Sequence, residues 1–159
     1  MTEEEVLNLI KEKFPNIEGN IPEHQRKRVH INTEKDKIKE IARFLKENGF
    51  RHLSFITCVD WIDDGEFELV YGFYSYDEKI VIVVKTRIPR DNPIQETLLP
   101  LWHQAQTYER EIHEMFGVKF EGNPRLTPFI LEDWEGIPPM RKDFDSRKYS
   151  QIIYDREAE

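Results

Sequence analysis

The sequence predicts an α+β domain in which N-terminal helices pack on one face of an antiparallel sheet, with a further helix and an extended C-terminal tail. Two stretches within the first 50 residues repeat apolar side chains with the period of a helix. Residues 53–87 instead hold three apolar segments that are separated by short turn-forming stretches. Helices and strands that follow each other in blocks, without regular alternation, are typical of the α+β class.

Both N-terminal helices have recognisable ends. The first is expected over residues 2–14, with Thr2 as its N-cap and glutamates in its first turn. After a short strand at 28–32, the second helix is expected over residues 36–48, capped by Thr33 and ended by Gly49. The inward positions would be Val6, Leu7, Ile10 and Phe14 in the first helix and Ile38, Ile41, Ala42 and Leu45 in the second.

Three strands are expected to form the sheet. The turn signals "DDG" and "DEK" separate them, and turns this short join antiparallel neighbours. The run "IVIVVKTR" lacks polar alternation and suits a strand that is covered on both faces. Alternation predicts one apolar face made of Leu53, Phe55, Thr57, Val59 and Trp61, and another made of Phe67, Leu69, Tyr71 and Phe73.

The chain changes character after Gly117. A helix is expected over residues 101–116, with Pro100 breaking the turn before it and Gly117 ending it. Residues 118–159 combine prolines with scattered aromatic side chains and show no sustained period. We therefore divide the chain into an α+β core domain, residues 1–117, and an extended tail, residues 118–159, that packs on partner subunits or on the domain itself.

The composition argues against several classes of protein. A formal net charge of −8 argues against nucleic-acid binding. The basic segment "HQRKRVH" is interpreted as a solvated entry into a strand or, as a second choice, as a patch for an acidic partner. Cys58 is the only cysteine, so it is expected to be a buried, inert thiol, and no cysteine cluster is present to hold zinc or iron–sulfur. No apolar stretch is long enough to span a membrane, which predicts a soluble, intracellular chain, and the 34% of charged residues favours a thermophilic source.

Glu109 lies where the third helix should be apolar. At about 100° per residue, it falls within the stripe that Ala105 and Ile112 define, and His113 lies at the edge of that stripe. A buried carboxylate needs a partner because its desolvation is costly. Three interpretations remain open: a structural anchor, a contact at an interface, and acid–base or metal chemistry shared with His113. The candidate partners are His113, Arg125, Arg141 and Lys142, and hydrogen bonding to the tail would also tie the tail to the helix.

The motifs of common catalytic and metal sites are absent from the sequence. It contains neither the His-Glu-x-x-His of zinc proteases nor the repeated Glu-x-x-His of di-iron bundles. It also lacks a P-loop, Gly-x-Ser-x-Gly and Gly-x-Gly-x-x-Gly. We therefore assign no catalytic, cofactor-binding or metal-binding residue to this chain.

"YEREIHEMFGVKFEGNPRL" followed by "LEDWEGIPPMRKDFD" resembles the "30-kDa" (C) subunit of respiratory complex I. It also resembles that subunit's relatives in membrane-bound nickel–iron hydrogenases and hydrogenase-derived complexes. The sheet region, from "TCVDW" through "VKTRIPRDNP", and the later landmarks "DWEG" and "RKDF" match in order. The resemblance spans residues 28–144. The family's core motif matches Glu109, Arg110, Glu111, Glu114 and Gly117.

The resemblance implies a role without a cofactor in this chain. Iron–sulfur clusters, and in a hydrogenase a nickel–iron centre, would belong to partner subunits. The chain would pack beside the large catalytic subunit and the small iron–sulfur subunit in the peripheral arm, on the cytoplasmic side of the membrane, and would meet the membrane arm only indirectly. The tail residues expected to contact partners are Phe129, Trp134, Met140, Arg141 and Phe144.

Departures from the family pattern favour its hydrogenase-type branch. Asn123 stands where quinone-reducing members usually carry a histidine, and Thr127 and Pro128 stand where they carry a basic residue. We therefore expect a complex that oxidises ferredoxin, with an NADH:quinone oxidoreductase as the alternative. A hypothesis of another class is a free-standing soluble enzyme that uses Glu109 and His113.

Overall fold

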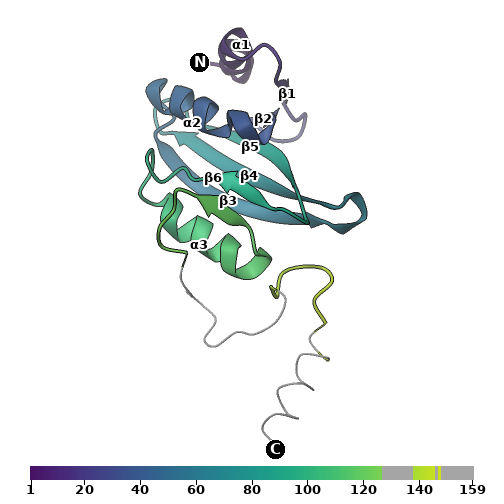
Figure 1. Cartoon of the computed structure of the whole chain (residues 1–159). Helices are drawn as coiled ribbons and strands as arrows, with labels where there is room; N and C mark the ends of the chain where they lie inside the picture. The colour runs from purple at the N-terminus through teal and green to yellow at the C-terminus, as the bar shows by residue number, and fades with distance from the viewer. Residues whose placement is uncertain (127–137, 146, 148–159) are drawn as a thin grey trace, which may run out of the picture.

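The structure, a computed structural model, describes residues 1–126, 138–145 and 147, and it confirms the α+β class. In this part of the chain, helices cover a five-stranded sheet with the order β1-β2-β5-β4-β3, and β6 and β7 form a second, small sheet (Figure 1). The helices are α1 (Glu3–Lys13), α2 (Ile38–Glu47) and α3 (Ala105–Phe116), with the 3-10 turns η1 (Lys35–Lys37) and η2 (Ile62–Asp64). The strands are β1 (Glu18–Asn20), β2 (Arg28–Asn32), β3 (His52–Trp61), β4 (Glu66–Ser75), β5 (Ile80–Pro89), β6 (Ile94–Glu96) and β7 (Lys119–Glu121).

The N-terminal helices pack on one face of the large sheet, as predicted. Thr2 begins α1 with a capping box, in which its side chain accepts the Glu5 N–H and the Glu5 carboxylate accepts the Thr2 N–H. The prediction that Thr33 caps the second helix is wrong. The 3-10 turn η1 precedes α2, and neither η1 nor α2 has a side-chain cap. Gly49, with φ 94°, follows α2 as expected. The buried helix positions are Val6, Leu7 and Ile10 in α1 and Ile38, Ile41, Ala42 and Leu45 in α2.

The large sheet is mixed, which corrects the expectation of an antiparallel one. β3, β4 and β5 form the predicted antiparallel meander. However, β2 pairs with β5 in parallel, from Arg28 opposite Val81 to Asn32 opposite Lys85. The reason is that the connection after β2 crosses through α2 to the far edge of the sheet, and the meander then returns β5 to the side of β2. The short turns that predicted antiparallel pairing join only β3, β4 and β5, so they carried no information about β2.

A register shift between Leu53 and Phe55 changes which side of β3 faces the helices. Leu53 pairs with Phe73 and Ile56 pairs with Tyr71, so Ile56 and the alternate residues after it join the buried face. The prediction that Leu53 shares a face with Phe55, Thr57, Val59 and Trp61 is therefore wrong. Phe55 lies on the opposite face, and its ring covers Gly72, where a Cβ atom would stand 2.3 Å from the ring.

α3 begins four residues later than predicted. The Trp102 indole N–H donates to the Arg51 carbonyl at 2.8 Å, and the Leu98 carbonyl accepts the Trp102 N–H, so turns occupy this stretch. Gly117, with φ 82°, ends α3 as expected. After it, Val118 and Phe120 are buried in the same core as the helices, so the start of the predicted tail contributes to the domain's packing. The boundary at residue 117 stays a prediction.

Candidate functional site

Glu109 is fully buried in α3 and accepts hydrogen bonds from three neighbours. The Thr97 hydroxyl lies 2.9 Å from Oε2, and the Leu98 N–H donates to the same oxygen at 3.1 Å. The Asn123 side-chain amide donates to Oε1 at 3.3 Å. Thr97 and Leu98 follow β6 and Asn123 follows β7. The carboxylate therefore joins α3 to the loops that leave both strands of the small sheet.

The donors around Glu109 are held in fixed orientations. Thr97 Oγ1 accepts the Leu99 N–H at 3.0 Å, which leaves its own hydrogen free to point at Glu109. Asn123 Oδ1 accepts the Arg125 N–H at 3.0 Å, which turns the amide NH₂ toward the carboxylate. An ionised carboxylate only accepts hydrogen bonds, so three donors that need nothing in return match it.

The four side chains predicted as partners of Glu109 are wrong, because none of its described hydrogen bonds comes from a histidine or a cation, whereas the predicted hydrogen bond to the tail is confirmed by Asn123. His113 Nδ1 instead bonds the Val118 carbonyl at 2.8 Å. The Arg141 guanidinium Nε donates to the Phe116 carbonyl at 2.7 Å. Helical spacing placed His113 one turn from Glu109, whereas the fold brings in donors from loops on either side of α3. Sequence reasoning had no signal for Thr97, and it noted Asn123 only as a departure from the family pattern.

Burial and hydrogen bonding act in opposite directions on the Glu109 carboxyl. Burial raises its pKa and the bonds from Thr97, Leu98 and Asn123 lower it, with a net increase above the ordinary glutamate value. Burial, followed by the charge of Glu109, also raises the pKa of the Tyr71 hydroxyl. Cys58 is half-buried and not fully buried as predicted, and burial raises the pKa of its thiol to about 12.

The raised pKa of Glu109 predicts a pH-dependent contribution to stability. The folded state retains a proton on Glu109 at pH values where the unfolded chain has lost it. This contribution is therefore complete below the ordinary glutamate pKa and is lost as the pH rises through the folded-state pKa. The measurement is urea unfolding of the wild type and Glu109→Gln from about pH 4 to about pH 8. The wild type minus variant difference in unfolding free energy should fall with rising pH, and a flat or rising difference would contradict the prediction.

Tyr71→Phe is expected to stabilise the protein slightly. The Tyr71 hydroxyl is fully buried and has no hydrogen-bond partner among the described residues, so its desolvation is uncompensated in the folded state. Removing it without changing the ring should raise the free energy of unfolding by about 1 kcal/mol. Tyr74→Phe, on the half-exposed side of the same strand, serves as the control. A loss of stability in Tyr71→Phe on urea unfolding would show that the hydroxyl is satisfied.

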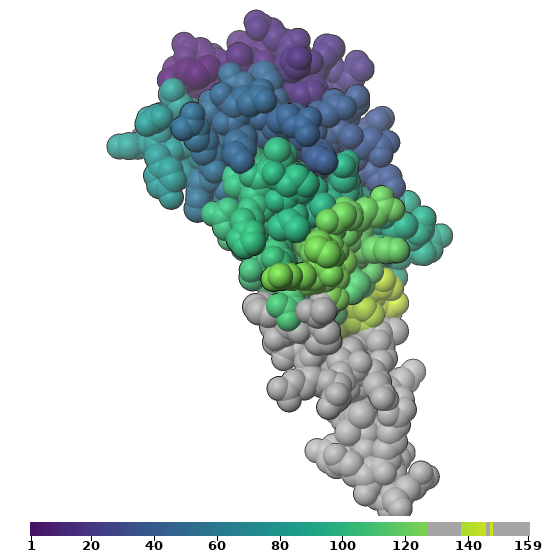
Figure 2. Space-filling model, turned by 60° about the vertical axis from the view of Figure 1, so that its left-hand side comes forward, coloured from purple at the N-terminus to yellow at the C-terminus, as the bar shows by residue number. Residues whose placement is uncertain are grey.

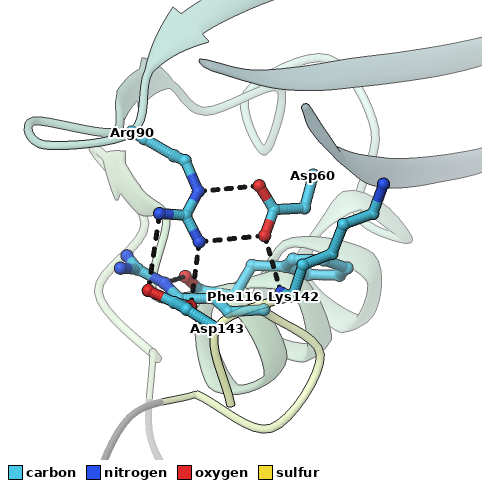
Figure 3. A network of polar contacts seen from close by, with 6 residues as sticks. Asp60, Arg90, Phe116, Lys142 and Asp143 are labelled. Carbon is cyan, nitrogen blue, oxygen red and sulfur yellow. Dashed lines mark hydrogen bonds and ion pairs between the residues drawn. The ribbon is translucent and has the colours of Figure 1, made fainter. Parts of the chain in front are cut away.

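A second polar constellation centres on Asp60 and Arg90 (Figure 3). The Arg90 guanidinium donates two hydrogen bonds to the buried Asp60 carboxylate, from Nε to Oδ1 at 2.7 Å and from Nη2 to Oδ2 at 2.9 Å. The same Nη2 lies 2.9 Å from Asp143, and the Lys142 backbone N–H donates to Asp60 at 2.8 Å. Burial raises the pKa of Asp60, but the Arg90 and Lys142 bonds outweigh it and the net pKa is lowered. Asp60, Arg90 and Asp143 are called the clamp below.

Further contacts hold the segment that contains Asp143 against the C-terminal end of α3, and Figure 2 shows this segment (yellow) lying on the domain. The Met140 N–H donates to the Met115 carbonyl at 2.9 Å. Arg141 satisfies the next helix carbonyl, that of Phe116, and its guanidinium lies over the Phe67 ring at 5.1 Å. These contacts supply the partners that the last carbonyls of a helix lack.

An apolar groove of about 380 Å³ runs between the edge strand β3 and α3. Met140, 57% exposed, stands at its rim. The groove lining includes Phe55, Ile56, Tyr108, Ile112, Met115 and Met140.

Among the described residues, no group of three His, Cys, Asp or Glu side chains could hold a metal ion. No helix in the same described part is long and apolar enough to cross a membrane.

The structure brings some of the predicted site residues together and leaves others apart. In the family-motif set, Glu109 faces the core and Glu111 faces solvent, while Arg110 and Glu114 are half-buried. Of the predicted partner contacts, Met140, Arg141 and Phe144 lie in the clamped segment, and Phe129 and Trp134 lie outside the described residues. Asp60 and Arg90 were missed, although both stand in stretches that carry the family resemblance.

Residues 31–150 match the family described as the respiratory-chain NADH dehydrogenase 30 Kd subunit. The chain therefore belongs to this family, as the motifs around Glu109 predicted. The match includes both polar constellations, the Glu109 site and the clamp, together with the segment that the clamp holds.

Archaeal proteins are among its relatives. The chain is 34% identical over 142 residues to the C subunit of F(420)H(2) dehydrogenase from Methanosarcina mazei, covering 88% of this chain and 90% of the relative. It is 32% identical over 146 residues to the beta subunit of the membrane-bound hydrogenase from Pyrococcus furiosus, covering 88% and 84%. Among solved structures, a chain of the membrane-bound sulfane sulfur reductase, an archaeal respiratory membrane complex, superposes with a TM-score of 0.87 at 40% identity. That superposition covers 96% of this chain and 91% of the other.

Proposed function

We propose that this chain is a non-catalytic assembly subunit of a membrane-bound, energy-converting oxidoreductase. In this proposal it belongs to the peripheral arm on the cytoplasmic side, and it docks the large catalytic subunit and the iron–sulfur small subunit. The observation that carries the proposal is the superposition on a chain of the sulfane sulfur reductase complex, which spans nearly the whole of both chains. The electron carriers would be iron–sulfur clusters, and in a hydrogenase nickel–iron, in the partners.

The internal satisfaction of Glu109 also supports a structural role. The three described donors to this carboxylate belong to the loops after β6 and β7, so their hydrogen bonds hold both loops against α3. His113 Nδ1 bonds the Val118 backbone carbonyl, and none of the described hydrogen bonds of Glu109 involves His113. This geometry fits an anchor better than the free-standing enzyme that would use both residues.

The docking contacts are proposed for the tail. Met140 presents an exposed apolar side chain at the rim of the groove, which suits a contact that becomes buried against a partner. Arg141 and Phe144 flank the clamp, and Arg141 has its guanidinium engaged by the domain, so its part in docking would be indirect. Phe129 and Trp134 complete the proposed set.

Three candidate reactions are proposed for the whole complex. Ferredoxin oxidation by a hydrogenase or hydrogenase-derived complex is supported by the likeness to the hydrogenase beta subunit and to the sulfane sulfur reductase chain. F(420)H(2) oxidation is a second candidate, favoured by 34% identity over 90% of the Methanosarcina protein. NADH:quinone oxidoreduction remains the alternative that the family description supplies.

Purification of the tagged full chain from its native membranes tests the assembly role. The expected result is co-purification of a large subunit and iron–sulfur subunits in fixed ratio, with the iron in those partners and not in the isolated chain. Nickel in the retained large subunit would identify a hydrogenase. Recovery of the chain alone, with a stoichiometric metal lost on Glu109→Gln and His113→Gln substitution, would overturn the proposal in favour of an enzyme.

A further inference from the structure

We infer that the clamp acts as a latch, which holds residues 138–145 against the domain and can open while the domain stays folded. In the closed state, Asp143 and Arg90 position Met140 at the groove. The inference rests on the proposed function only for what the positioned segment does, which is to meet a partner subunit. The latch itself is a property of the isolated chain.

The latch connects three separate parts of the fold. Asp60 stands near the end of β3, Arg90 directly follows β5, and Asp143 belongs to the C-terminal segment. Arg90 places one guanidinium nitrogen, Nη2, at 2.9 Å from a carboxylate oxygen on each side. The Asp60 half is buried at 3% exposure, whereas the Asp143 side chain is 44% exposed. The Arg90–Asp60 pair is therefore a permanent part of the domain, and the Arg90–Asp143 pair is its weaker, solvent-accessible side.

The segment is held mainly by polar contacts. Its backbone is joined to the domain through the Met140 N–H and the Lys142 N–H, at 2.9 Å and 2.8 Å from their acceptors. Met140 is exposed and Phe144 is half-buried, so neither contributes the burial of a core side chain. A segment with few buried apolar contacts opens at a lower free energy than the domain core. Charge pairs at its surface make that opening depend on salt.

The segment 138–145 lies against the C-terminal end of α3, so its attachment to the domain determines where Met140 lies. Arg141 reaches back over the end of α3, and its guanidinium lies 3.1 Å from the place where a Cβ on Gly117 would stand. A glycine at this position therefore gives both the left-handed helix end and the space for Arg141. Because Arg141 and the clamp hold the residues that directly follow it, and its own N–H donates to the Met115 carbonyl, Met140 is fixed beside Met115 and the groove.

Hydrogen exchange of the full chain tests the latch. Asp143→Asn should make the Met140 and Lys142 amides exchange about fivefold faster, with amides of β4 and β5 unchanged, because a surface pair contributes on the order of 1 kcal/mol. Asp63→Asn, an exposed aspartate of η2, is the charge-matched control and should change neither set. Asp143→Glu should restore slow exchange. Arg141→Gln, which removes the bond to the Phe116 carbonyl, provides a second way to open the segment.

Unchanged exchange at Met140 and Lys142 in both variants would overturn the latch, as would an equal acceleration in β4 and β5. Retention of the large subunit from native membranes then tests the positioning role, with Asp143→Asn expected to retain less than Asp63→Asn. Equal retention would overturn that role. If the wild type retains no partner, the proposed function fails, while the exchange measurement still decides the latch.

Discussion

Glu109→Ala is expected to lower the free energy of unfolding by about 3–5 kcal/mol, the combined cost of unsatisfied buried donors and of a cavity. The substitution leaves the Thr97 hydroxyl, the Leu98 N–H and the Asn123 amide without an acceptor in a site that water does not reach. It also opens a cavity in a close-packed region. The loss should be measured as a shift of the urea midpoint with an unchanged slope.

Two variants separate this loss from a general effect on α3. Glu111→Ala removes an exposed glutamate from the same helix and should change stability by no more than about 0.5 kcal/mol. Glu109→Gln keeps the shape and one acceptor oxygen but points an NH₂ group at a donor, so its loss should be smaller than that of alanine. A loss below about 1 kcal/mol in Glu109→Ala would show that the anchor is dispensable for folding.

Arg90→Ala is the second large expected effect. It leaves the Asp60 carboxylate buried without its cation, at a cost of about 3–5 kcal/mol in unfolding free energy. The double variant Asp60→Asn with Arg90→Ala should recover part of this loss, because no unpaired charge is then buried. Non-additivity of at least about 1 kcal/mol between the single and double variants is expected from thermal or urea unfolding.

Arg87→Ala provides the matched control for Arg90→Ala. Arg87 also pairs with carboxylates, Asp64 at 2.9 Å among them, but on the exposed face of the sheet. Its removal should cost no more than about 1 kcal/mol. Equal losses for the two arginines would indicate that burial of Asp60 does not determine the value of its pair.

The sequence predicted the elements that have a period and missed those that have none. Periodicity located α1, α2, β2 and the β3–β5 meander, and the out-of-place Glu109 correctly indicated a satisfied buried carboxylate. β1, β6 and β7 have three residues each, too few for an alternation to register. The parallel pairing of β2 with β5 depends on the path of the whole chain, which local turns do not reveal.

The contacts of the site were less predictable than the position of Glu109. Its helical neighbour His113 was the nearest candidate in sequence, but the fold supplies Thr97 and Asn123 from the two loops of the small sheet. Asp60 and Arg90 are 30 positions apart and meet only because β3 and β5 flank β4. Long-range partners of this kind follow from tertiary packing, which the pattern of a single sequence does not reveal.

The central place of β5 also sets an order of events in folding. β3, β4 and β5 are joined by short turns and can associate through contacts that are close along the chain. β2 is made before them and can pair with β1 on one side, but its partner on the other side, β5, is made only at the end of the meander. During synthesis, the β2 edge that faces β5 therefore stays unpaired until residues 81–85 have left the ribosome.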